Sequence, residues 1–423
     1  MRLAIVGNPA NRRVALFAAA VARAGLPAPT VYAWRDILTG GPVPTPDETV
    51  RIDSPGEDPE VDHLLRATAA QAQPSEVDRL PHITAAQEHR NHAARAWPSD
   101  MRHLPHITTA RPQPTHPLGE VAQARPHEIG GGAAAFAGLG LALERVAAGG
   151  GRLLNPVGDI LTMNDKRRCH GLLVEAGIPV PPALPPVTSF AELRAAMAAY
   201  GWARVFVKPA HGSSASGVVA LAVSGRRILA TTSVEIGADG RLYNNLRVRR
   251  YEDEPTIAGI VDRLAPDGLH VERWFPKAGL GDRVLDLRVV VIAGEPSHIV
   301  ARTSRTPLTN LHLGNARGDV AAVRAAAGPT AWNQAMQTCV AVARCFPRSL
   351  HVGVDLMFRA GWRTHAVAEV NAFGDLLPGV LATRPAGGEP LRGPGRDGLD
   401  TYGAQIEALL DGRYDSWTGA CVS

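Results

Sequence analysis

The chain has 423 residues, of which 45% are hydrophobic and 20% charged, a composition typical of folded globular domains. That length exceeds what one hydrophobic core usually organises, so we expect two or three domains. The formal net charge of +4 argues against a nucleic-acid partner, and the absence of any run of about 18 apolar residues argues against a membrane partner. A cytoplasmic location is therefore expected. The four cysteines form no Cys-x-x-Cys pair, which argues against a zinc ribbon or a disulfide scaffold.

The N-terminal residues predict a small parallel α/β domain. Residues 3–6 favour a buried strand, residues 13–24 a helix, and residues 31–33 a second strand. The turn after the first strand holds the single Gly7 instead of a Gly-x-Gly-x-x-Gly pattern, so it predicts no dinucleotide site.

A region of broken periodicity follows, and we expect a flexible His- and Pro-rich insertion at about 68–125 within an N-terminal domain of residues 1–150. Seven histidines lie between His82 and His127. A metal-binding tract is the alternative, but their irregular spacing and the lack of an accompanying cluster of thiols or carboxylates favour an insertion.

Regular patterns return after residue 151. Thr162 and Asp165 form a capping-box pattern at the start of one helix, and Ser189 and Glu192 form another. The other predicted elements are strands at 205–207 and 218–223, hairpins at 287–301 and 352–370, and a helix at 332–343.

A Gly- and Ser-rich loop follows the predicted strand that ends at Lys208. Small residues let backbone N–H groups and hydroxyls surround phosphate oxygens, and the lysine adds a positive charge. The order differs from a Walker P-loop, in which the lysine follows the glycines. Taken alone, the stretch is equally compatible with an ordinary hairpin loop. The loop residues are His211, Gly212, Ser213, Ser214, Ala215, Ser216 and Gly217.

Two carboxylates and an amide are predicted to meet on one hairpin. Glu369 and Asn371 are two residues apart on a strand and therefore share a face. The turn near Gly361 brings Asp355 opposite them. Such oxygen ligands suit Mg²⁺ bound together with phosphates, and a cation offsets the cost of burying carboxylates. Carboxylates on a solvated sheet face are the alternative.

The order of these motifs resembles the ATP-grasp superfamily, and most closely its branch of glutathione synthetases and ribosomal-protein-modifying glutamate ligases. The motifs run from the Asp-Lys helix start at 165–166 through Val-Lys-Pro, the Gly-Ser-Ser loop, Val-Glu-Arg-Trp, Asp-Leu-Arg and Asn-Leu-His to the final Asp…Glu-x-Asn. The resemblance covers about residues 153–380. It departs from the family after Asn371 and at 278–285, where this chain is longer, so the second hinge carboxylate stays unassigned.

The resemblance implies an α/β fold with α+β lobes: an N-terminal parallel α/β domain, a small ATP-grasp lobe at 151–275 and a C-terminal lobe at 276–423. Carried over by position, it implies ATP contacts from Lys166, Lys208, His211, Gly212, Ser213, Ser214, Gly217 and Glu272, catalytic roles for Arg302, Asn315 and Arg288, and Mg²⁺ ligation by Asp355, Glu369 and Asn371.

The activity implied is a Mg²⁺-dependent, ATP-using ligase. It would activate a small-molecule or peptide carboxylate as an acyl phosphate, present it to an amine-type nucleophile, and release ADP and phosphate. Two alternatives stay open: a small-molecule kinase on the same scaffold, and a non-catalytic ATP-binding module. The identities of both substrates and the oligomeric state are also open.

Overall fold

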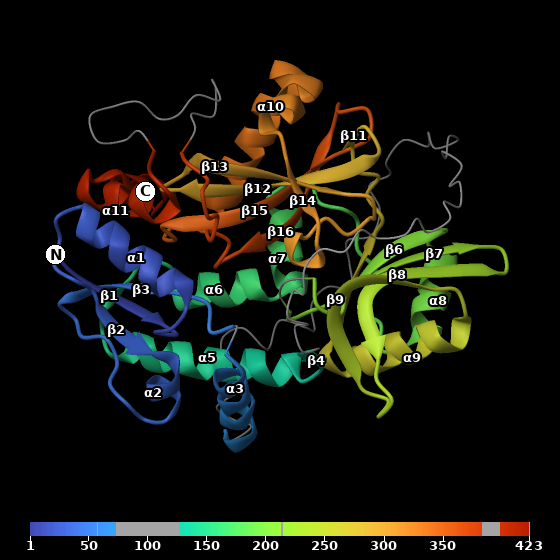
Figure 1. Ribbon diagram of the computed structural model, residues 1–423, viewed down its shortest axis with the longest axis horizontal. Coiled ribbons are helices and arrows are strands. Elements are labelled where there is room, and N and C mark those ends of the chain that lie inside the picture. The colour runs from blue at the N-terminus through green and yellow to red at the C-terminus, as the bar shows by residue number, and fades with distance from the viewer. Residues whose placement is uncertain (57, 73–126, 213–214, 383–397, 423) are drawn as a thin grey trace, which may run out of the picture.

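A computed structural model describes residues 1–56, 58–72, 127–212, 215–382 and 398–422. Three sheets, each covered by helices, make up the molecule (Figure 1). The α/β fold class is confirmed, with one parallel sheet and two antiparallel sheets. Within the described residues, no helix combines the length and the apolar character needed to cross a membrane.

The N-terminal sheet is parallel, with strand order β2-β1-β3-β5. Leu3 and Ile5 face α1 and α11, whereas Ala4 and Val6 face the core that contains α5, as expected for alternating side chains on a strand. Its elements are β1 (Arg2–Gly7), α1 (Arg12–Arg23), β2 (Thr30–Ala33), α2 (Trp34–Leu38), β3 (Glu48–Ile52), α3 (Pro59–Gln71), α5 (Gly132–Ala148) and β5 (Arg152–Leu153).

The small lobe is a six-stranded antiparallel sheet of order β10-β6-β7-β8-β9-β4. Helices α8 and α9 pack on one face through a core that includes Leu193, Val205, Val207 and Ile260. Its elements are β4 (His127–Ile129), α8 (Phe190–Ala199), β6 (Arg204–Pro209), β7 (Val219–Ser224), β8 (Arg227–Ile236), β9 (Leu242–Tyr251), α9 (Glu254–Leu264) and β10 (Leu269–Arg273).

The large lobe is an antiparallel sheet of order β14-β13-β12-β15-β16, with β11 paired to β12. Helix α10 covers one face through Trp332, Met336 and Cys339. Its elements are β11 (Gly279–Leu280), β12 (Arg283–Ile292), β13 (Glu295–Ser304), β14 (Ala316–Gly318), α10 (Val320–Arg344), β15 (His351–Phe358), β16 (His365–Asn371), α11 (Thr401–Leu410) and α12 (Arg413–Val422).

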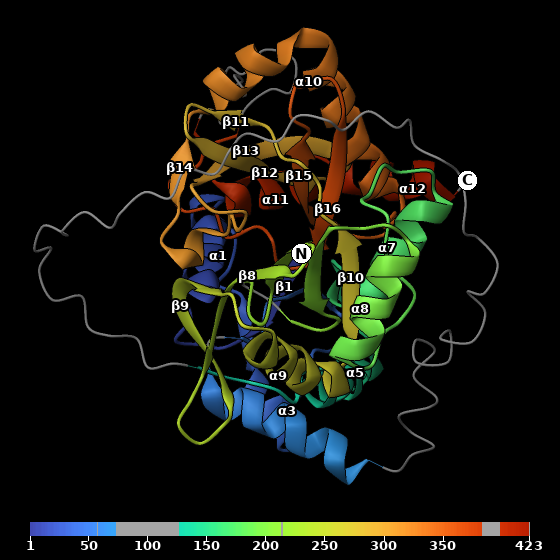
Figure 2. The same cartoon turned by 90° about the vertical axis from the view of Figure 1, so that its right-hand side faces the viewer.

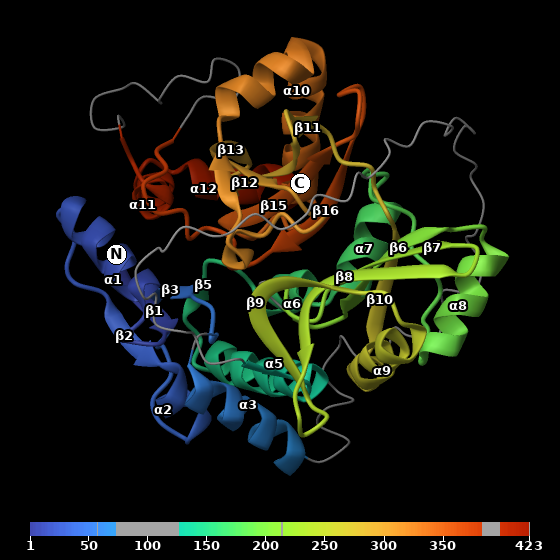
Figure 3. The ribbon, with the colours of Figure 1, turned by 45° about the vertical axis from the view of Figure 1, so that its right-hand side comes forward.

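Helices α6 (Val157–Asn164) and α7 (Lys166–Glu175) join the three parts. Both contact β16 of the large lobe, and α6 also contacts α5. Figure 3 shows the N-terminal part, the small lobe and the large lobe arranged around these helices, and Figure 2 views the molecule past the small-lobe helices. Elements on either side of residues 150 and 275 contact one another, so these contacts do not define domain boundaries there. The boundaries expected at residues 150 and 275 stay a proposal.

Two details of the predicted elements need correction. Thr162 lies inside α6, and Asp165 alone caps α7 by accepting the N–H groups of Arg167 and Arg168. The predicted insertion begins too early, because residues 68–71 belong to α3. Its His-rich part, residues 73–126, lies outside the described residues. The Ser189 cap is confirmed, since its side chain accepts the N–H of Glu192.

Candidate active site

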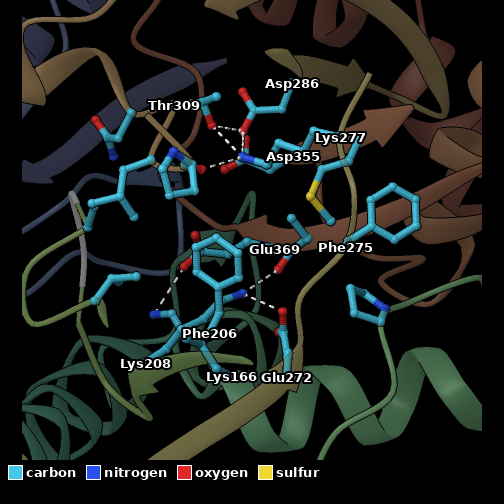
Figure 4. A pocket seen from close by; sticks show the side chains of 18 of the residues that line it. Lys166, Phe206, Lys208, Glu272, Phe275, Lys277, Asp286, Thr309, Asp355 and Glu369 are labelled. Atoms are coloured by element: carbon cyan, nitrogen blue, oxygen red, sulfur yellow. Dashed lines mark hydrogen bonds and ion pairs between the residues drawn. The ribbon is translucent and has the colours of Figure 1, made fainter. Parts of the chain in front are cut away.

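A cleft of about 810 Å³, open to solvent, lies between the small-lobe and large-lobe sheets (Figure 4). Strands β6 and β10 supply one wall, and β12, β13, β15 and β16 supply the other. The charged residues that line it are Lys166, Lys208, Glu272, Arg273, Lys277, Asp286, Arg302, Asp355 and Glu369.

The small-lobe wall follows from the alternation of β6. Val205 and Val207 are buried in the lobe core, so Phe206 and Lys208 face the cleft. Glu272 pairs with Phe206 in the β6–β10 register and therefore shares its face. Residues Phe275 and Met357 form an apolar cluster that also lines the cleft. Aromatic and apolar side chains from both lobes thus offer walls suited to a flat ring.

Lys208 and Glu272 form a buried ion pair with an Nζ–Oε2 distance of 2.7 Å. The other carboxylate oxygen of Glu272 accepts a hydrogen bond from His270 Nε2 at 2.9 Å. Burial acts to raise the pKa of Glu272, but the charge of Lys208 and the His270 hydrogen bond outweigh it and hold that pKa well below its usual range. Lys208 Nζ also donates to the Ala368 carbonyl at 3.3 Å, which links the two lobes.

Lys166 bridges the loop and the large lobe. Its Nζ lies 3.1 Å from Glu369 Oε1 and donates to the Gly212 carbonyl at 2.6 Å. The backbone N–H of Lys166 donates to the Ala210 carbonyl at 3.0 Å. The start of α7 and the start of the Gly/Ser loop are therefore held together.

Asp355 is held between two arginines of the large lobe. Arg288 pairs with both of its oxygens, and Arg302 Nη2 lies 3.1 Å from its Oδ2. Burial acts to raise the pKa of Asp355, but the charges of Arg288 and Arg302 outweigh it and keep that pKa below its ordinary value. The carboxylate therefore stays ionised inside the protein.

A second cluster lies beside this one. Arg302 Nε donates to Asp286 Oδ1 at 2.7 Å, and Lys277 Nζ lies 3.3 Å from Asp286 Oδ2. Lys277 also donates to Thr309 Oγ1 at 2.7 Å, and Thr309 donates to Asp286 (Figure 4). Burial lowers the pKa of Lys277, although the charge of Asp286 opposes this.

The expected Mg²⁺ ligands lie on one face of neighbouring strands. Asp355 pairs with Glu369 in the β15–β16 register, and Asn371 lies two pairs along, opposite Gly353. All three carry hard oxygen donors, so the set fits Mg²⁺. A cation here would share Asp355 with two arginines and compete with Lys166 for Glu369. Among the described residues, histidines, cysteines and acidic residues do not form a group of three or more that could hold a metal. Asp355 and Glu369 would therefore need the amide oxygen of Asn371 as the third protein ligand.

The structure brings some expected residues into the cleft and not others. Lys166, Lys208, Gly212, Glu272, Arg302, Asp355 and Glu369 line it. His211, Gly217, Arg288, Asn315 and Asn371 are outside its lining, and Ser213 and Ser214 lie outside the described residues.

These outlying residues have other contacts. Asn315 donates to the carbonyls of Leu308 and Asn310 at 2.7 and 2.9 Å, so its amide holds a loop that lines the cleft. Arg288 lies behind Asp355. Gly217 has a φ of +72°, and a Cβ there would lie 2.7 Å from the Pro209 ring, which explains the need for glycine.

Sequence reasoning missed part of the cleft. Phe206 was detectable, because it lies two residues before Lys208 on the same strand. Met357 was detectable in the same way, because it lies two residues after Asp355 on one strand. Lys277 and Phe275 carried no comparable signal, since each reaches the cleft only through the packing of distant segments.

The cysteines are poorly suited to act as nucleophiles in the cleft. Burial raises the pKa of the Cys169 thiol to about 12 and also raises the pKa of Cys339 and Cys345. None of the described cysteines lines the cleft between the lobes. A thiolate nucleophile is therefore disfavoured.

A parallel α/β domain and two antiparallel lobes lie around this cleft, which is the arrangement that the resemblance to the ATP-grasp superfamily implied. The chain is similar to D-cycloserine synthetase DcsG, with TM-score 0.48 and 15% identity over 98% of this chain and 100% of that one. It is similar to the ATP-grasp ligase PsnB, complexed with precursor peptide PsnA2 and AMPPNP, with TM-score 0.44 and 14% identity over 98% of each chain. It is also similar to macrocyclase MdnC bound with precursor peptide MdnA from Microcystis aeruginosa MRC, with TM-score 0.47 and 10% identity over 97% and 100%. No protein-family model and no curated protein matches the sequence. These likenesses carry no conclusion about chemistry, which depends on the residues of this chain.

Proposed function

We propose that this chain is a Mg²⁺-dependent, ATP-using ligase that activates a carboxylate as an acyl phosphate. The observation that supports the proposal is that lysines and carboxylates line opposite walls of one cleft. Lysines 166 and 208 stand on one side, and Asp355, Glu369 and Arg302 stand on the other. Cationic groups and paired carboxylates that meet in this way suit a nucleotide triphosphate with its metal ion.

ATP would lie with its base toward the apolar walls of Phe206, Phe275 and Met357. The carboxylate of Glu272 and the carbonyl of Ala368 lie beside this end, and both are hydrogen-bond acceptors suited to an amino group. The phosphates would then run toward Lys166 and Gly212. This orientation places the γ-phosphate near Glu369, since Lys166 contacts both the loop and that carboxylate.

The metal would be held by Asp355, Glu369 and Asn371. When bound there, Mg²⁺ would neutralise the charge of the transferring phosphoryl group. Arg302 would contact the substrate carboxylate or the γ-phosphate, because its side chain lines the cleft while Asp286 and Asp355 hold its guanidinium in place. Arg288 acts behind it by orienting Asp355.

The substrate carboxylate is the nucleophile of the first step. One of its oxygens bonds to the γ-phosphorus while the bond from that phosphorus to the β–γ bridging oxygen breaks, which gives an acyl phosphate and ADP. An amine-type nucleophile then attacks the acyl carbon, and phosphate leaves. The raised pKa values of the Cys169 and Cys345 thiols disfavour a covalent intermediate on either cysteine.

Product analysis tests this proposal. A library of small carboxylic acids and peptides with amines is screened for substrate-dependent ADP release, and the carboxylate of any hit is labelled with heavy oxygen. We expect one labelled oxygen in the released phosphate. AMP as the nucleotide product would refute the ligase mechanism, and a phosphorylated product that is released without condensation would support the kinase alternative.

A further inference from the structure

The N-terminal domain reaches the nucleotide site through the first turn of α5. Phe136 stacks on His211 with ring centroids 4.1 Å apart and an interplanar angle of 16°. His211 is the first residue of the Gly/Ser loop, and Phe136 belongs to a helix of the parallel α/β domain. The two residues are 75 positions apart along the chain, so no local pattern connects them.

The start of α5 is fitted closely to the small lobe. A Cβ at Gly132 would lie 2.9 Å from the His211 carbonyl oxygen, so glycine permits this approach. The N–H of Ala133 donates to Asp267 Oδ1 at 3.2 Å. Just before the helix, β4 adds to the edge of the small-lobe sheet by pairing with β9.

The rest of α5 is fixed to the N-terminal domain. A Cβ at Gly138 would lie 1.9 Å from the Leu65 carbonyl oxygen, which shows how closely α3 and α5 pack. Leu143 and Val146 are fully buried in the core that includes Ala4 and Val6 of β1. The helix therefore packs against both the N-terminal domain and the small lobe, and it carries Phe136 where the two meet.

His211 links Phe136 to the nucleotide site through a hydrogen bond to Asp165. Its Nε2 donates to Asp165 Oδ2 at 3.2 Å, while Asp165 Oδ1 caps α7. Lys166, the next residue, donates to the Gly212 carbonyl. Burial acts to raise the pKa of Asp165, but the hydrogen bond and charge of His211 outweigh it and hold that pKa below its usual value. The ring of His211 is thus held between Phe136 and the cap of the helix that carries Lys166.

We propose that Phe136 is a positioning residue of the nucleotide site, which holds His211 against Asp165 and so fixes Lys166 and Gly212 where the phosphates of ATP bind. This role rests on the proposed function. It assigns the N-terminal domain a part in positioning the residues that bind ATP, in addition to any part in shaping the substrate pocket. The contact lies behind Lys166 and Gly212, so we expect its loss to weaken the binding of the phosphates and to leave the binding of the base unchanged.

The test compares Phe136→Leu with Phe136→Tyr in the full chain by calorimetry, using a non-hydrolysable ATP analogue with Mg²⁺ and, separately, AMP. Loss of an aromatic stack predicts about threefold to tenfold weaker binding of the ATP analogue by Phe136→Leu. Phe136→Tyr retains the ring and should bind within about twofold of the wild type. AMP affinity should be unchanged in both variants. Tyr200→Leu is the matched control, because it removes an aromatic pair of the small lobe with Trp202, centroids 5.4 Å apart.

A second comparison separates positioning from general support of the fold. In a His211→Ala background, Phe136→Leu should cause no further loss of ATP-analogue affinity, because the stack it removes is already absent. Wild-type affinity in Phe136→Leu, an equal loss for AMP, or an additive loss in the double variant would each overturn the positioning role. No binding of the ATP analogue by the wild-type chain would overturn the proposed function itself.

Discussion

Replacing Lys208 by methionine tests the electrostatics of the cleft most directly. The variant retains an unbranched side chain but removes the charge that lies 2.7 Å from Glu272. Glu272 is 5% exposed, so its carboxylate loses a partner that water cannot replace. Breaking a buried ion pair from one side typically costs about 3–5 kcal/mol of folding free energy. We expect the lower end of that range, because His270 still donates to the carboxylate.

The cost should depend on pH through His270. In the wild type, burial lowers the pKa of His270, and the charge of Lys208 adds to that effect, although Glu272 opposes both. Without Lys208, the unpaired Glu272 raises the pKa of His270. A folded pKa that is higher in the variant than in the wild type makes the folded variant take up a proton more readily, so the variant gains stability relative to the wild type as the pH falls. The variant should therefore be less destabilised at pH 6 than at pH 8.

Thermal and denaturant unfolding at these two pH values would measure the effect in the wild type, Lys208→Met and the double variant Lys208→Met/Glu272→Gln. The double variant should regain most of the lost stability, since no buried charge is left without a partner. Lys208→Met should also bind ATP more weakly. The reasoning is refuted if Lys208→Met unfolds like the wild type at both pH values, or if the double variant is no more stable than the single one.

Three further predictions address other parts of the chain. Glu369→Gln should lower turnover at saturating Mg²⁺ by about 100-fold or more, because one anionic metal ligand is lost; wild-type turnover would contradict the metal assignment. His351 is buried, and burial lowers its pKa to about 4. As the pH falls, the imidazole of His351 therefore takes up a proton in the unfolded state before it does so in the folded state. The wild type should lose about 2 kcal/mol of folding free energy between pH 7 and pH 5, and His351→Gln should not show this loss. Equal changes in stability with pH in the two proteins would show that His351 is not responsible. Replacing residues 73–126 by a Gly/Ser linker should preserve folding and ATP binding, because α3 ends at Gln71 and β4 begins at His127. Loss of both would show that the segment packs on the core, and a zinc-dependent change in the melting temperature of the wild type would support the metal-binding alternative.

Local sequence determined much of this protein. Alternation on strands predicted that Glu369 and Asn371 share a face, and the hairpin turn predicted Asp355 opposite them, as the register shows. The sequence also predicted an early parallel α/β domain, because hydrophobic strands alternated there with a periodic helix. These features depend on residues a few positions apart, where geometry follows from backbone periodicity. Even so, Thr162 was assigned to a cap that Asp165 forms alone, because two consecutive helices share that stretch.

Only the tertiary structure decided which partners the charged residues have. The two arginines on Asp355, the contact of Lys277 with Thr309 and the stack of Phe136 on His211 all join distant segments. Such contacts depend on how sheets and helices pack, and packing is set by the whole core, so no local pattern reveals them. The sequence thus determined which chemical groups the cleft contains, and tertiary packing decided that Asp355 is held by arginines and that a helix of the N-terminal domain reaches the Gly/Ser loop.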